Sequence, residues 1–343
     1  MLKIYPNTIV YVHCPAGVVT GGAELLHQLV SFLNDNGRES YIVYWGDRPH
    51  SLPLEYQCYN IKIADNIVDS NENVEVIYEG IFNFVSLHKS TQKFLWWLSV
   101  DHFYTCSTTF LSIADLLKFD FKLGMYSFLK RMYFKIFSHA RYPKEVISIK
   151  KLRDLDSING YQSEYAQHFL QVQGFKEQMA LKDYINTEHF EHSINLSNRE
   201  DIILYNPKKG LNYTRKLIAK SPDLKWIPIQ NMTRSQLIQL MEKAKVYVDF
   251  GYHPGKDRLP RECAVNGCCI ITGMRGSAAF FEDVMIPRKY KFDEKKASIN
   301  EIVKMIRWTL NNYEDAIVDF QLYCKKILSE KKEFEEQITM IFL

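Results

Sequence analysis

The segment that most restricts the fold of this chain is residues 249–272, together with the strand in which it begins. A buried run, 246–250, ends in a loop rich in glycine, proline and charged residues. Glu262 then opens a short segment of small residues that ends at Gly267, before a second buried run, 268–272. A strand, a loop, a short helix and a strand in this order are typical of a parallel α/β unit, which places ligand-binding groups at the carboxyl ends of its strands.

Positive charge and glycine surround this predicted sheet edge. A glycine-containing loop follows the second strand, and its backbone amides at Gly276, Ser277 and Ala278 are candidates for binding a phosphate. Another predicted strand, 201–205, leads through lysines into a helix, whose N-terminal amides also favour anions. The candidate phosphate cations are Lys208, Lys209, Lys256, Arg258 and Arg261, of which Lys208, Lys256 and Arg258 are preferred. These groups suit a nucleotide diphosphate, and a solvated turn of similar composition is the alternative.

The residues Leu259-Pro-Arg-Glu262-Cys-Ala-Val-Asn-Gly267 carry a resemblance to a known family. They are similar to the Pro-x-x-Glu-Ala-x-Ala-x-Gly phrase in the nucleotide-sugar half of retaining GT-B glycosyltransferases of family 4, also called group 1. Many bacterial polysaccharide enzymes belong to this group. By this resemblance, Glu262 binds the ribose hydroxyls of the donor nucleotide. The alternative is a glutamate that only complements the helix dipole in the first turn.

The chain departs from this family at one position. The family carries a second acid eight positions before the glutamate, where this sequence has Pro254. Contacts with the donor sugar are therefore expected from Asp257 or Lys256. In related enzymes a loop after the second strand of this half contacts the nucleotide base. By resemblance, the matching positions here are Ile229, Asn231 and Met232.

The resemblance implies an α/β chain with the GT-B fold, in which two Rossmann-like domains face each other across a cleft. The predicted domains are an N-terminal acceptor domain, 1–190, a nucleotide-sugar donor domain, 200–320, and a C-terminal helix, 321–343. In many GT-B proteins such a helix crosses back to the first domain. An aromatic and basic helical insertion is expected near 103–144, and the polar segment 187–199 is the predicted linker.

Several further elements follow from apolar periodicity and capping residues. Strands are expected at 40–45, 74–78, 146–149 and 226–229, where short apolar runs lie between turn residues. Thr233 is expected to cap a helix that follows it, because its side chain can accept a hydrogen bond from a free amide of the first turn.

The first half also places polar residues after predicted strands. A strand at 8–13 runs into a glycine-rich loop and a helix, without the Gly-x-Gly-x-x-Gly spacing of a dinucleotide site. By resemblance, Gly21, Gly22 and Glu24 match the Gly-Gly-x-Glu with which many GT-B enzymes open. A plain helix N-terminus is the alternative for these residues.

Retaining GT-B enzymes usually offer a histidine of the first domain near the donor sugar. His102 follows Asp101 at the end of a very apolar strand, 94–98, and strand ends are where α/β proteins present functional groups. His13 ends the first strand. The catalytic candidates are therefore His102, His13 and Asp101, and a structural histidine is the alternative for both rings.

Residues 121–144 mix aromatic and basic residues without a single acid. The basic residues are Lys122, Lys130, Arg131, Lys135, Arg141 and Lys144. Such a segment suits peripheral contact with a membrane surface that contains anionic lipid. The alternative is an ordinary helix whose aromatic side chains pack into the domain core while its charges remain in water.

Composition excludes several other classes of protein. The net charge of +3 gives no case for nucleic acid as a partner, and no apolar run is long enough to span a membrane. The seven cysteines have no paired spacing, which predicts reduced thiols, and the start of the chain is unlike a signal peptide, so a cytoplasmic protein is expected. If residues 121–144 contact lipid, the protein would lie at the inner face of the membrane. No cluster has metal-ligand spacing except Asp154-Leu155-Asp156, which is expected to be a solvated turn, so no metal or other cofactor is predicted.

The sequence therefore predicts a metal-independent, retaining GT-B glycosyltransferase. It would move a sugar from a nucleotide diphosphate to a glycan or lipid-linked acceptor, and by resemblance it would act in bacterial surface polysaccharide synthesis, such as lipopolysaccharide or capsule. The alternatives are another GT-B enzyme, such as a sugar-nucleotide epimerase, and an inactive GT-B relative that acts as a nucleotide-binding or scaffolding subunit.

Overall fold

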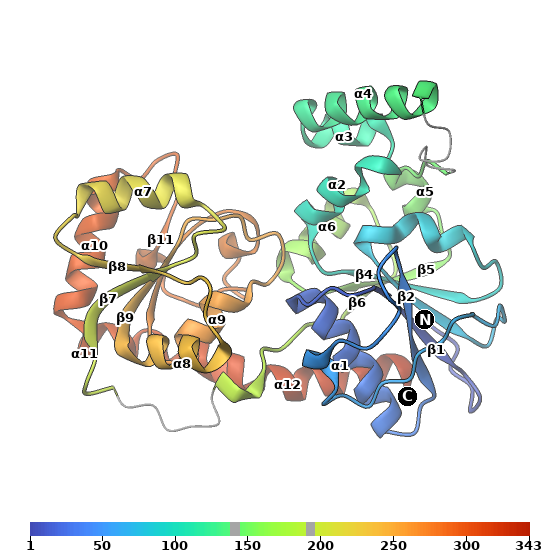
Figure 1. The fold of residues 1–343 in the computed structure, drawn as a ribbon, viewed down its shortest axis with the longest axis horizontal. Coiled ribbons are helices and arrows are strands. Elements are labelled where there is room, and N and C mark those ends of the chain that lie inside the picture. The colour runs from blue at the N-terminus through green and yellow to red at the C-terminus, as the bar shows by residue number, and fades with distance from the viewer. Residues whose placement is uncertain (138–144, 190–195) are drawn as a thin grey trace. The chain divides into compact units, whose positions relative to one another are not determined.

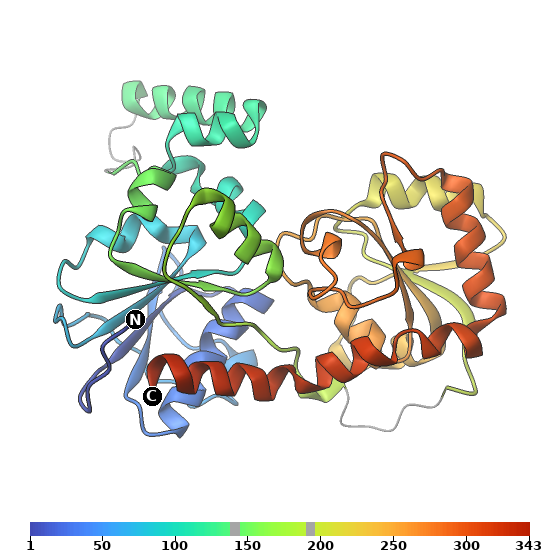
Figure 2. The ribbon, with the colours of Figure 1, turned by 180° about the vertical axis from the view of Figure 1, so that it is seen from behind.

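The computed structural model describes residues 1–137, 145–189 and 196–343 (Figures 1 and 2). The chain divides into two compact α/β units. Unit 1 consists of Met1–Gln162, Ala166–Lys182 and Glu333–Leu343, and unit 2 consists of Ser163–Tyr165 and Asp183–Lys332.

Unit 1 is built on a parallel sheet of six strands in the order β2-β1-β3-β4-β5-β6. Its strands are β1 (Val10–Pro15), β2 (Ser40–Trp45), β3 (Val74–Tyr78), β4 (Gln92–Trp97), β5 (Ser157–Tyr161) and β6 (Gln178–Ala180). The central strands are buried almost throughout, because helices cover both faces of a parallel sheet and every side chain then packs against protein.

The helices of unit 1 follow its strands in the order expected of βα units (Figure 1). The α-helices are α1 (Gly21–Asp35), α2 (Val100–Cys106), α3 (Ile113–Phe119), α4 (Phe121–Phe137), α5 (Ile149–Arg153) and α6 (Glu164–Gln173), with short 3₁₀ segments η1 (Leu54–Tyr56), η2 (Glu79–Ser86) and η3 (Ser107–Thr109). The end of α12 (Gln321–Phe342) also belongs to this unit, where the Phe342 ring packs 5.2 Å from that of Phe94.

Helix α4 has an unusual distribution of side chains, because its buried face is small and polar. Gly124, Ser127 and Arg131 are its buried residues. A Cβ atom at position 124 would lie 2.8 Å from the backbone nitrogen of Leu117 in α3, so glycine permits the close approach of the two helices. Ser127 Oγ and Arg131 Nη2 both donate hydrogen bonds to the carbonyl oxygen of Thr108, at 2.5 Å and 2.8 Å.

Most of the large apolar side chains of α4 therefore point away from the core of unit 1. Phe121, Tyr126, Leu129, Tyr133 and Phe137 are each more than half exposed, at 67%, 58%, 60%, 57% and 71%. The alternative that these aromatics fill the domain core is wrong for the described part of the segment. Residues 138–144 of the predicted basic segment lie outside the described residues.

Unit 2 is built on a second parallel sheet, with five strands in the order β11-β10-β9-β7-β8. The strands are β7 (Glu200–Tyr205), β8 (Lys225–Pro228), β9 (Ala244–Asp249), β10 (Cys269–Gly273) and β11 (Lys291–Phe292). The sheet forms the centre of one hydrophobic core, in which Val246, Val248, Ile270 and Ile271 are completely buried.

The helices of unit 2 connect these parallel strands. They are α7 (Leu211–Lys220), α8 (Arg234–Lys243), α9 (Arg258–Val265), α10 (Ile299–Asn311), α11 (Tyr313–Val318) and the first part of α12, with 3₁₀ segments η5 (Thr187–His189), η6 (Gly276–Ala279) and η7 (Arg288–Tyr290). Thr233 caps α8 as expected, and Gln236 completes a capping box with it. The predicted linker lies partly outside the described residues, at 190–195.

One predicted strand is wrong. Residues 146–149 form no strand, because only Ile147 pairs with another segment, through a single bridge to Leu111. Ser148 instead caps α5, where its side chain accepts a hydrogen bond from the amide of Lys151. Asp154 and Asp156 are exposed in the turn after this helix, as the sequence predicts.

Candidate functional site

The candidate site lies at the carboxyl edge of the unit 2 sheet, where strand order reverses. Strand β7 lies between β8 and β9, so the chain turns to opposite sides of the sheet after β7 and after β9, the position at which open α/β sheets bind ligands. The two loops touch at glycines. A Cβ atom at Gly210, whose φ is +64°, would lie 2.4 Å from the carbonyl carbon of Phe250, and one at Gly251 would lie 2.6 Å from the Cβ of Lys209.

Glu262 lies on α9 beside this edge and is 8% exposed. The helix begins at Arg258, so Glu262 lies in its second turn, and the expectation that it stands in the first turn is wrong. Among the described residues, the titratable side chain that contacts it is His189, whose Nε2 lies 3.6 Å from Glu262 Oε1. Burial lowers the pKa of His189, although the charge of Glu262 opposes this. No hydrogen bond from the described part of the chain reaches the Glu262 carboxylate.

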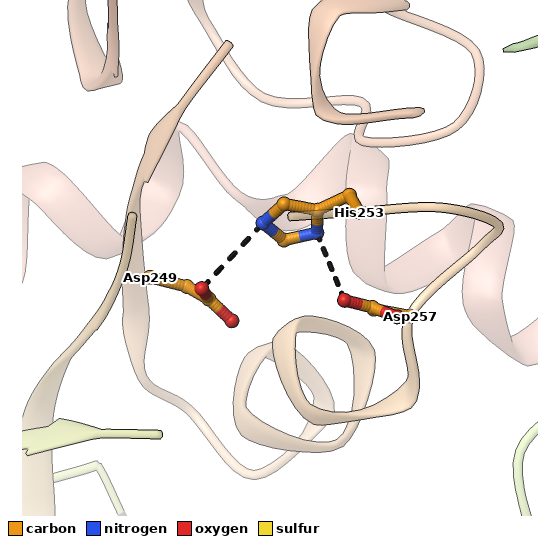
Figure 3. A group of neighbouring side chains, drawn as sticks. All are labelled: Asp249, His253 and Asp257. Carbon is orange, nitrogen blue, oxygen red and sulfur yellow. Dashed lines mark ion pairs between the residues drawn. The ribbon is translucent and has the colours of Figure 1, made fainter. Parts of the chain in front are cut away.

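His253 lies between two carboxylates in the loop after β9 (Figure 3). Its Nε2 is 3.6 Å from Asp249 Oδ1 and its Nδ1 is 3.3 Å from Asp257 Oδ2, and the ring is completely buried. Both oxygens of Asp257 accept hydrogen bonds from Lys209 Nζ at 2.8 Å. The oxygens of Asp249 accept from the amide of Gly251 at 2.8 Å and from the hydroxyl of Tyr247 at 2.7 Å.

This group has the residue types of a metal site, since Asp249, His253 and Asp257 can each bring one ligand atom within 4.8 Å of the others. Its four carboxylate oxygens accept hydrogen bonds within the protein, from Lys209, Gly251 and Tyr247. The contact between Lys209 and Asp257 also ties the loop after β9 to the loop after β7. Lys209 and Asp257, both predicted as ligand-binding residues, are partners in this contact.

Two of the predicted phosphate cations lie in a buried cluster of charges. Lys256 is 5% exposed and forms an ion pair with Glu330 of α12. Arg261 is completely buried, with Nη1 2.8 Å from Glu330 Oε2 and Nη2 2.7 Å from Asp183 Oδ2. Burial alone would raise the pKa of Asp183, but the charges of Arg261 and Lys256 lower it. These two cations neutralise carboxylates inside unit 2 and are not exposed at its surface.

The glycine loop after β10 packs against the same loop as His253. Gly276 has a φ of +58°, and a Cβ atom there would lie 1.9 Å from the carbonyl oxygen of His253. Ser277 donates its amide to that carbonyl at 2.8 Å and its hydroxyl to the carbonyl of Gly255 at 2.7 Å. The Ser277 amide is therefore occupied within the protein, and Ala278 is completely buried.

The remaining predicted residues of unit 2 line the surface of the same edge. Lys208 is exposed after β7, in a turn where its amide donates to Asn206 Oδ1 at 2.9 Å, and Arg258 is partly exposed at the start of α9. In the loop after β8, Ile229 is partly buried, whereas Asn231 and Met232 are exposed. Asn231 has a φ of +55°, a conformation in which asparagine is tolerated better than most side chains.

In unit 1, His102 lies on α2 between an acid and a thiol. Its Nδ1 is 3.7 Å from Glu79 Oε1, and its Nε2 is 2.7 Å from Cys106 Sγ. The hydrogen bond with Cys106, followed by that with Glu79, raises the pKa of His102 to about 10. Asp101 precedes it in the first turn of α2 and is partly exposed.

The other catalytic candidate, His13, is buried within a polar cluster on the strands of unit 1. Its Nε2 lies 2.9 Å from Glu75 Oε2, and the residue is 3% exposed. Glu75 also contacts His88 at 3.1 Å and Lys93 at 3.0 Å. This environment is typical of a structural histidine, the alternative that the sequence left open.

The predicted glycine loop of unit 1 forms the start of α1. The helix begins at Gly21, and Thr20 caps it by accepting a hydrogen bond from the amide of Ala23. Glu24 is 5% exposed and accepts a hydrogen bond from the hydroxyl of Tyr59 at 3.0 Å. Gly22 faces Leu98 at an ordinary contact distance of 3.9 Å for an added Cβ, so its backbone does not require glycine for packing.

The structure shows partners of the candidate residues that the sequence did not indicate. His253, Asp183, Glu330, Glu79 and Cys106 were not predicted at any site. For Cys106 a local signal existed, because His102 precedes it by four positions on a helix and such residues are neighbours. The other four are distant in sequence from the residues that they contact, or are hidden in a loop without regular spacing.

Neither a family model nor a curated protein matches this chain. Solved structures do match it. A glycosyltransferase from Rickettsia africae is 13% identical, with a TM-score of 0.54 over 98% of this chain and 99% of that one. HepE from Anabaena, solved with UDP-glucose, is 9% identical, with a TM-score of 0.57 over 97% and 99%.

TarM is 12% identical, with a TM-score of 0.53 over 80% of this chain and 56% of TarM, so the chain spans little more than half of the TarM length. Likeness at these identities shows the fold. The chain has the GT-B fold, with two parallel-sheet α/β units that resemble those of GT-B glycosyltransferases. The predicted fold class is confirmed.

Proposed function

We propose that this protein is a glycosyltransferase that uses a nucleotide-diphosphate sugar as donor and a glycan or lipid-linked molecule as acceptor. The observation that carries the proposal is the state of Glu262. The Glu262 side chain is 11% exposed at the carboxyl edge of the unit 2 sheet, and its carboxylate accepts no hydrogen bond from the described residues. The carboxylate is therefore open to a ligand, and ribose hydroxyls are suitable donors to it.

The donor would bind along the carboxyl edge of unit 2. Lys208 is the exposed cation best placed for the diphosphate, at a loop that leads into the N-terminus of α7. Ile229, Asn231 and Met232 remain the candidates for the base. Because HepE was solved with UDP-glucose and with UDP, a uridine nucleotide is the first donor to test.

For the transfer step we keep His102 and Asp101 as the candidates and set His13 aside. His102 is 53% exposed, whereas His13 is enclosed by its contacts with Glu75. We further propose that the reaction is metal-independent and retaining, and that it serves bacterial surface polysaccharide synthesis. The support for these three points is the family resemblance of the segment around Glu262.

We also propose that α4 contacts the surface of a membrane. The outward faces of α4 are aromatic and aliphatic, with Lys122 and Lys135 exposed among them. An apolar surface fringed by cations suits the interface of a bilayer that contains anionic lipid. The contact proposed is peripheral. None of the helices in the described ranges is long and apolar enough to cross a membrane. A lipid-linked acceptor would be reached at that surface.

Nucleotide-dependent thermal stabilisation tests the proposed donor site. UDP, GDP, CDP, ADP and dTDP are each added to the wild type and to Glu262→Gln, which removes the charge and keeps the size. One nucleotide at about 100 times its dissociation constant stabilises the native state by roughly 2.7 kcal/mol. We expect one nucleotide to raise the Tm of the wild type and to leave the Tm of Glu262→Gln unchanged. The control variant Glu314→Gln, on the exposed side of α11, should show the same rise as the wild type.

The alternatives give different results in the same series. Nucleotide binding without sugar transfer to any acceptor would indicate a binding or scaffolding subunit. A changed donor sugar without transfer would indicate an epimerase. If no nucleotide raises the Tm of a well-folded wild type, the proposal is wrong.

A further inference from the structure

The carboxyl edge of the unit 1 sheet carries a glutamate, a histidine and a cysteine in a row. Glu79 follows β3 directly, and His102 and Cys106 lie one turn apart on α2. Glu79 Oε1 is 3.7 Å from His102 Nδ1, and His102 Nε2 is 2.7 Å from Cys106 Sγ. The carboxylate is held in place, since Glu79 Oε2 accepts a hydrogen bond from the amide of Leu98 at 3.0 Å.

This is the order of groups that activates a nucleophile. A thiol becomes reactive when it is ionised, and a neighbouring imidazolium stabilises the thiolate. A third group that contacts the other ring nitrogen fixes the orientation of the imidazole and favours its charged form. Glu79 is in that position, with a side chain only 2% exposed, while the ring of His102 is 53% exposed.

We propose that Cys106 is a nucleophilic thiol, held as a thiolate–imidazolium pair with His102, and that it is a site of covalent modification by low-molecular-weight disulfides and related soft electrophiles. Both Cys106 and His102 are exposed, so a small reagent can approach the sulfur from solvent. The contacts with Cys106 and Glu79 that raise the pKa of His102 to about 10 agree with a charged ring at neutral pH.

The modification step is a thiol–disulfide exchange. The Cys106 thiolate attacks one sulfur of the disulfide, and a new sulfur–sulfur bond forms as the bond within the reagent breaks. The departing thiolate takes the proton of His102 Nε2, which leaves a neutral imidazole. The protein thiol is thereby oxidised to a mixed disulfide, and half of the reagent is reduced to a free thiol.

The other cysteines provide the contrast that makes this site distinct. Cys14, Cys263, Cys268 and Cys269 are buried, and Cys324 is partly buried. Burial raises the pKa of the Cys14 thiol to about 12 and that of Cys324 to about 11, so these thiols stay protonated. Cys58 is exposed like Cys106 and has no histidine among its described contacts, which makes it an internal standard.

Few other charged groups face this pair. Glu79 approaches from η2, and Tyr78 from the end of β3, where burial raises the pKa of its phenol so that it remains neutral. Asp101 lies on the same helix. The segment η3 that packs against α2 carries no charged residue, so among the described residues of this cluster His102 is the one basic group.

The test compares the reactivities of two thiols in one protein. The reduced full-length chain is labelled with iodoacetamide at pH 6 and pH 8, and the modified peptides of Cys106 and Cys58 are quantified by mass spectrometry. An ordinary thiol is well under 1% ionised at pH 6, so Cys106 should react at least about tenfold faster than Cys58 there. The ratio should fall at pH 8, and a neutral probe, hydroxyethyl disulfide, should form its mixed disulfide first at Cys106.

Two variants distinguish activation of Cys106 by His102 from the effect of solvent exposure alone. His102→Asn cannot carry a positive charge and lies at an exposed position, so it should fold normally and lose the advantage of Cys106 at pH 6. His50→Asn replaces an exposed histidine after β2 that contacts Gly46 and Tyr44, and it should keep that advantage. Equal rates for Cys106 and Cys58 in the wild type, or an advantage that persists in His102→Asn, would overturn the proposal. The labelling does not depend on nucleotide binding, so failure of the proposed function would leave it unaffected.

Discussion

Gly276 lies directly against the carbonyl group of His253, so that a Cβ atom at position 276 would come within 1.9 Å of the carbonyl oxygen. The adjacent amide of Ser277 donates to the same oxygen at 2.8 Å. The glycine loop after β10 and the loop after β9 are therefore one packed structure. This contact fixes the loop that leads from Asp249 to α9, on which Glu262 lies.

Gly276→Ala should lower the stability of unit 2 through two effects. Alanine in the left-handed region costs about 1 kcal/mol, and the clash with a backbone oxygen adds to it because neither loop can move freely. Gly37→Ala is the matched control, since Gly37 has a φ of +79° with open space around its Cβ direction. Thermal unfolding of the two variants measures the difference. Equal decreases in Tm would show that the two loops are not packed as described.

Arg261→Met should be strongly destabilising, because it leaves Asp183 and Glu330 buried without their shared guanidinium. Breaking a buried ion pair costs about 3–5 kcal/mol. Arg307→Met is the control, because Arg307 binds both oxygens of Asp223 at 2.7 Å in an exposed pair, which solvent screens so that its loss should change stability little. Denaturant unfolding of both variants gives the comparison.

The pH dependence of the Arg261→Met variant gives an independent test. In the wild type the charges of Arg261 and Lys256 outweigh burial and lower the pKa of Asp183, so its contribution to stability is lost as pH falls. Without Arg261, burial should raise that pKa, and the variant should gain relative stability as pH falls. The stability difference from the wild type should therefore be smaller at pH 4 than at pH 7. A constant difference would contradict the assigned network.

The buried carboxylate of Glu75 should make unit 1 sensitive to acid. Burial favours its protonation, but the hydrogen bonds from His13 and Thr91 and the charge of Lys93 lower the pKa to about 2, from an ordinary value of 4.5. A lowered carboxyl pKa stabilises the folded state above the unfolded value, and this stability is lost as pH falls from about 4.5 towards about 2. This difference between the folded and unfolded pKa of Glu75 corresponds to about 3 kcal/mol of folding free energy.

Glu75→Gln tests this assignment, because the amide has the same shape and does not titrate. The variant should be less stable than the wild type at pH 7, and its Tm should fall less steeply between pH 4.5 and pH 2. Glu55→Gln, at an exposed position in η1, should retain the steep wild-type profile. Parallel profiles for Glu75→Gln and the wild type would assign the acid sensitivity to other groups.

Strands and caps were the most predictable features because their signals are local. The apolar runs at 40–45 and 74–78 form β2 and β3 with the expected bounds, and Thr233 caps α8. The strand predicted at 146–149 was wrong because apolar residues at alternate positions are not unique to strands. Here Ile147 is buried from a loop and Ile149 from the first position of α5. The predicted helical segment begins at Glu262, whereas α9 begins at Arg258 and has Pro260 in its first turn, where proline is tolerated.

The sequence could predict where the candidate site lies, but not what each of its residues does. Parallel topology brings the loops after β7 and β9 to one edge, and their polar residues could be foreseen from strand order alone. The sequence could not show which cations face solvent. Lys256 and Arg261 resemble phosphate ligands, yet their partner Glu330 lies about 70 positions away on α12, and only the folded chain brings these charges together.

The outward surface of α4 gives the last prediction. Replacing Leu129, Tyr133 and Ile136 with glutamine removes three side chains that are 60%, 57% and 62% exposed. Because they contribute little to the core, the Tm should change by less than about 2 °C, as is usual for exposed positions. Binding to vesicles that contain phosphatidylglycerol should weaken at least about tenfold, since each such side chain stabilises insertion by roughly 1.5 kcal/mol or more when buried.

The control replaces Val318, Leu322 and Leu328 with glutamine, three apolar residues of α11 and α12 that are 56%, 56% and 52% exposed. This variant should bind vesicles as the wild type does, because no basic and aromatic helix is altered. Vesicle flotation measures both variants, and wild-type binding should decrease with added salt because Lys122 and Lys135 contribute through screened charge. Equal loss in the two variants would mean that exposed apolar area in general, and not α4, holds the protein at the membrane.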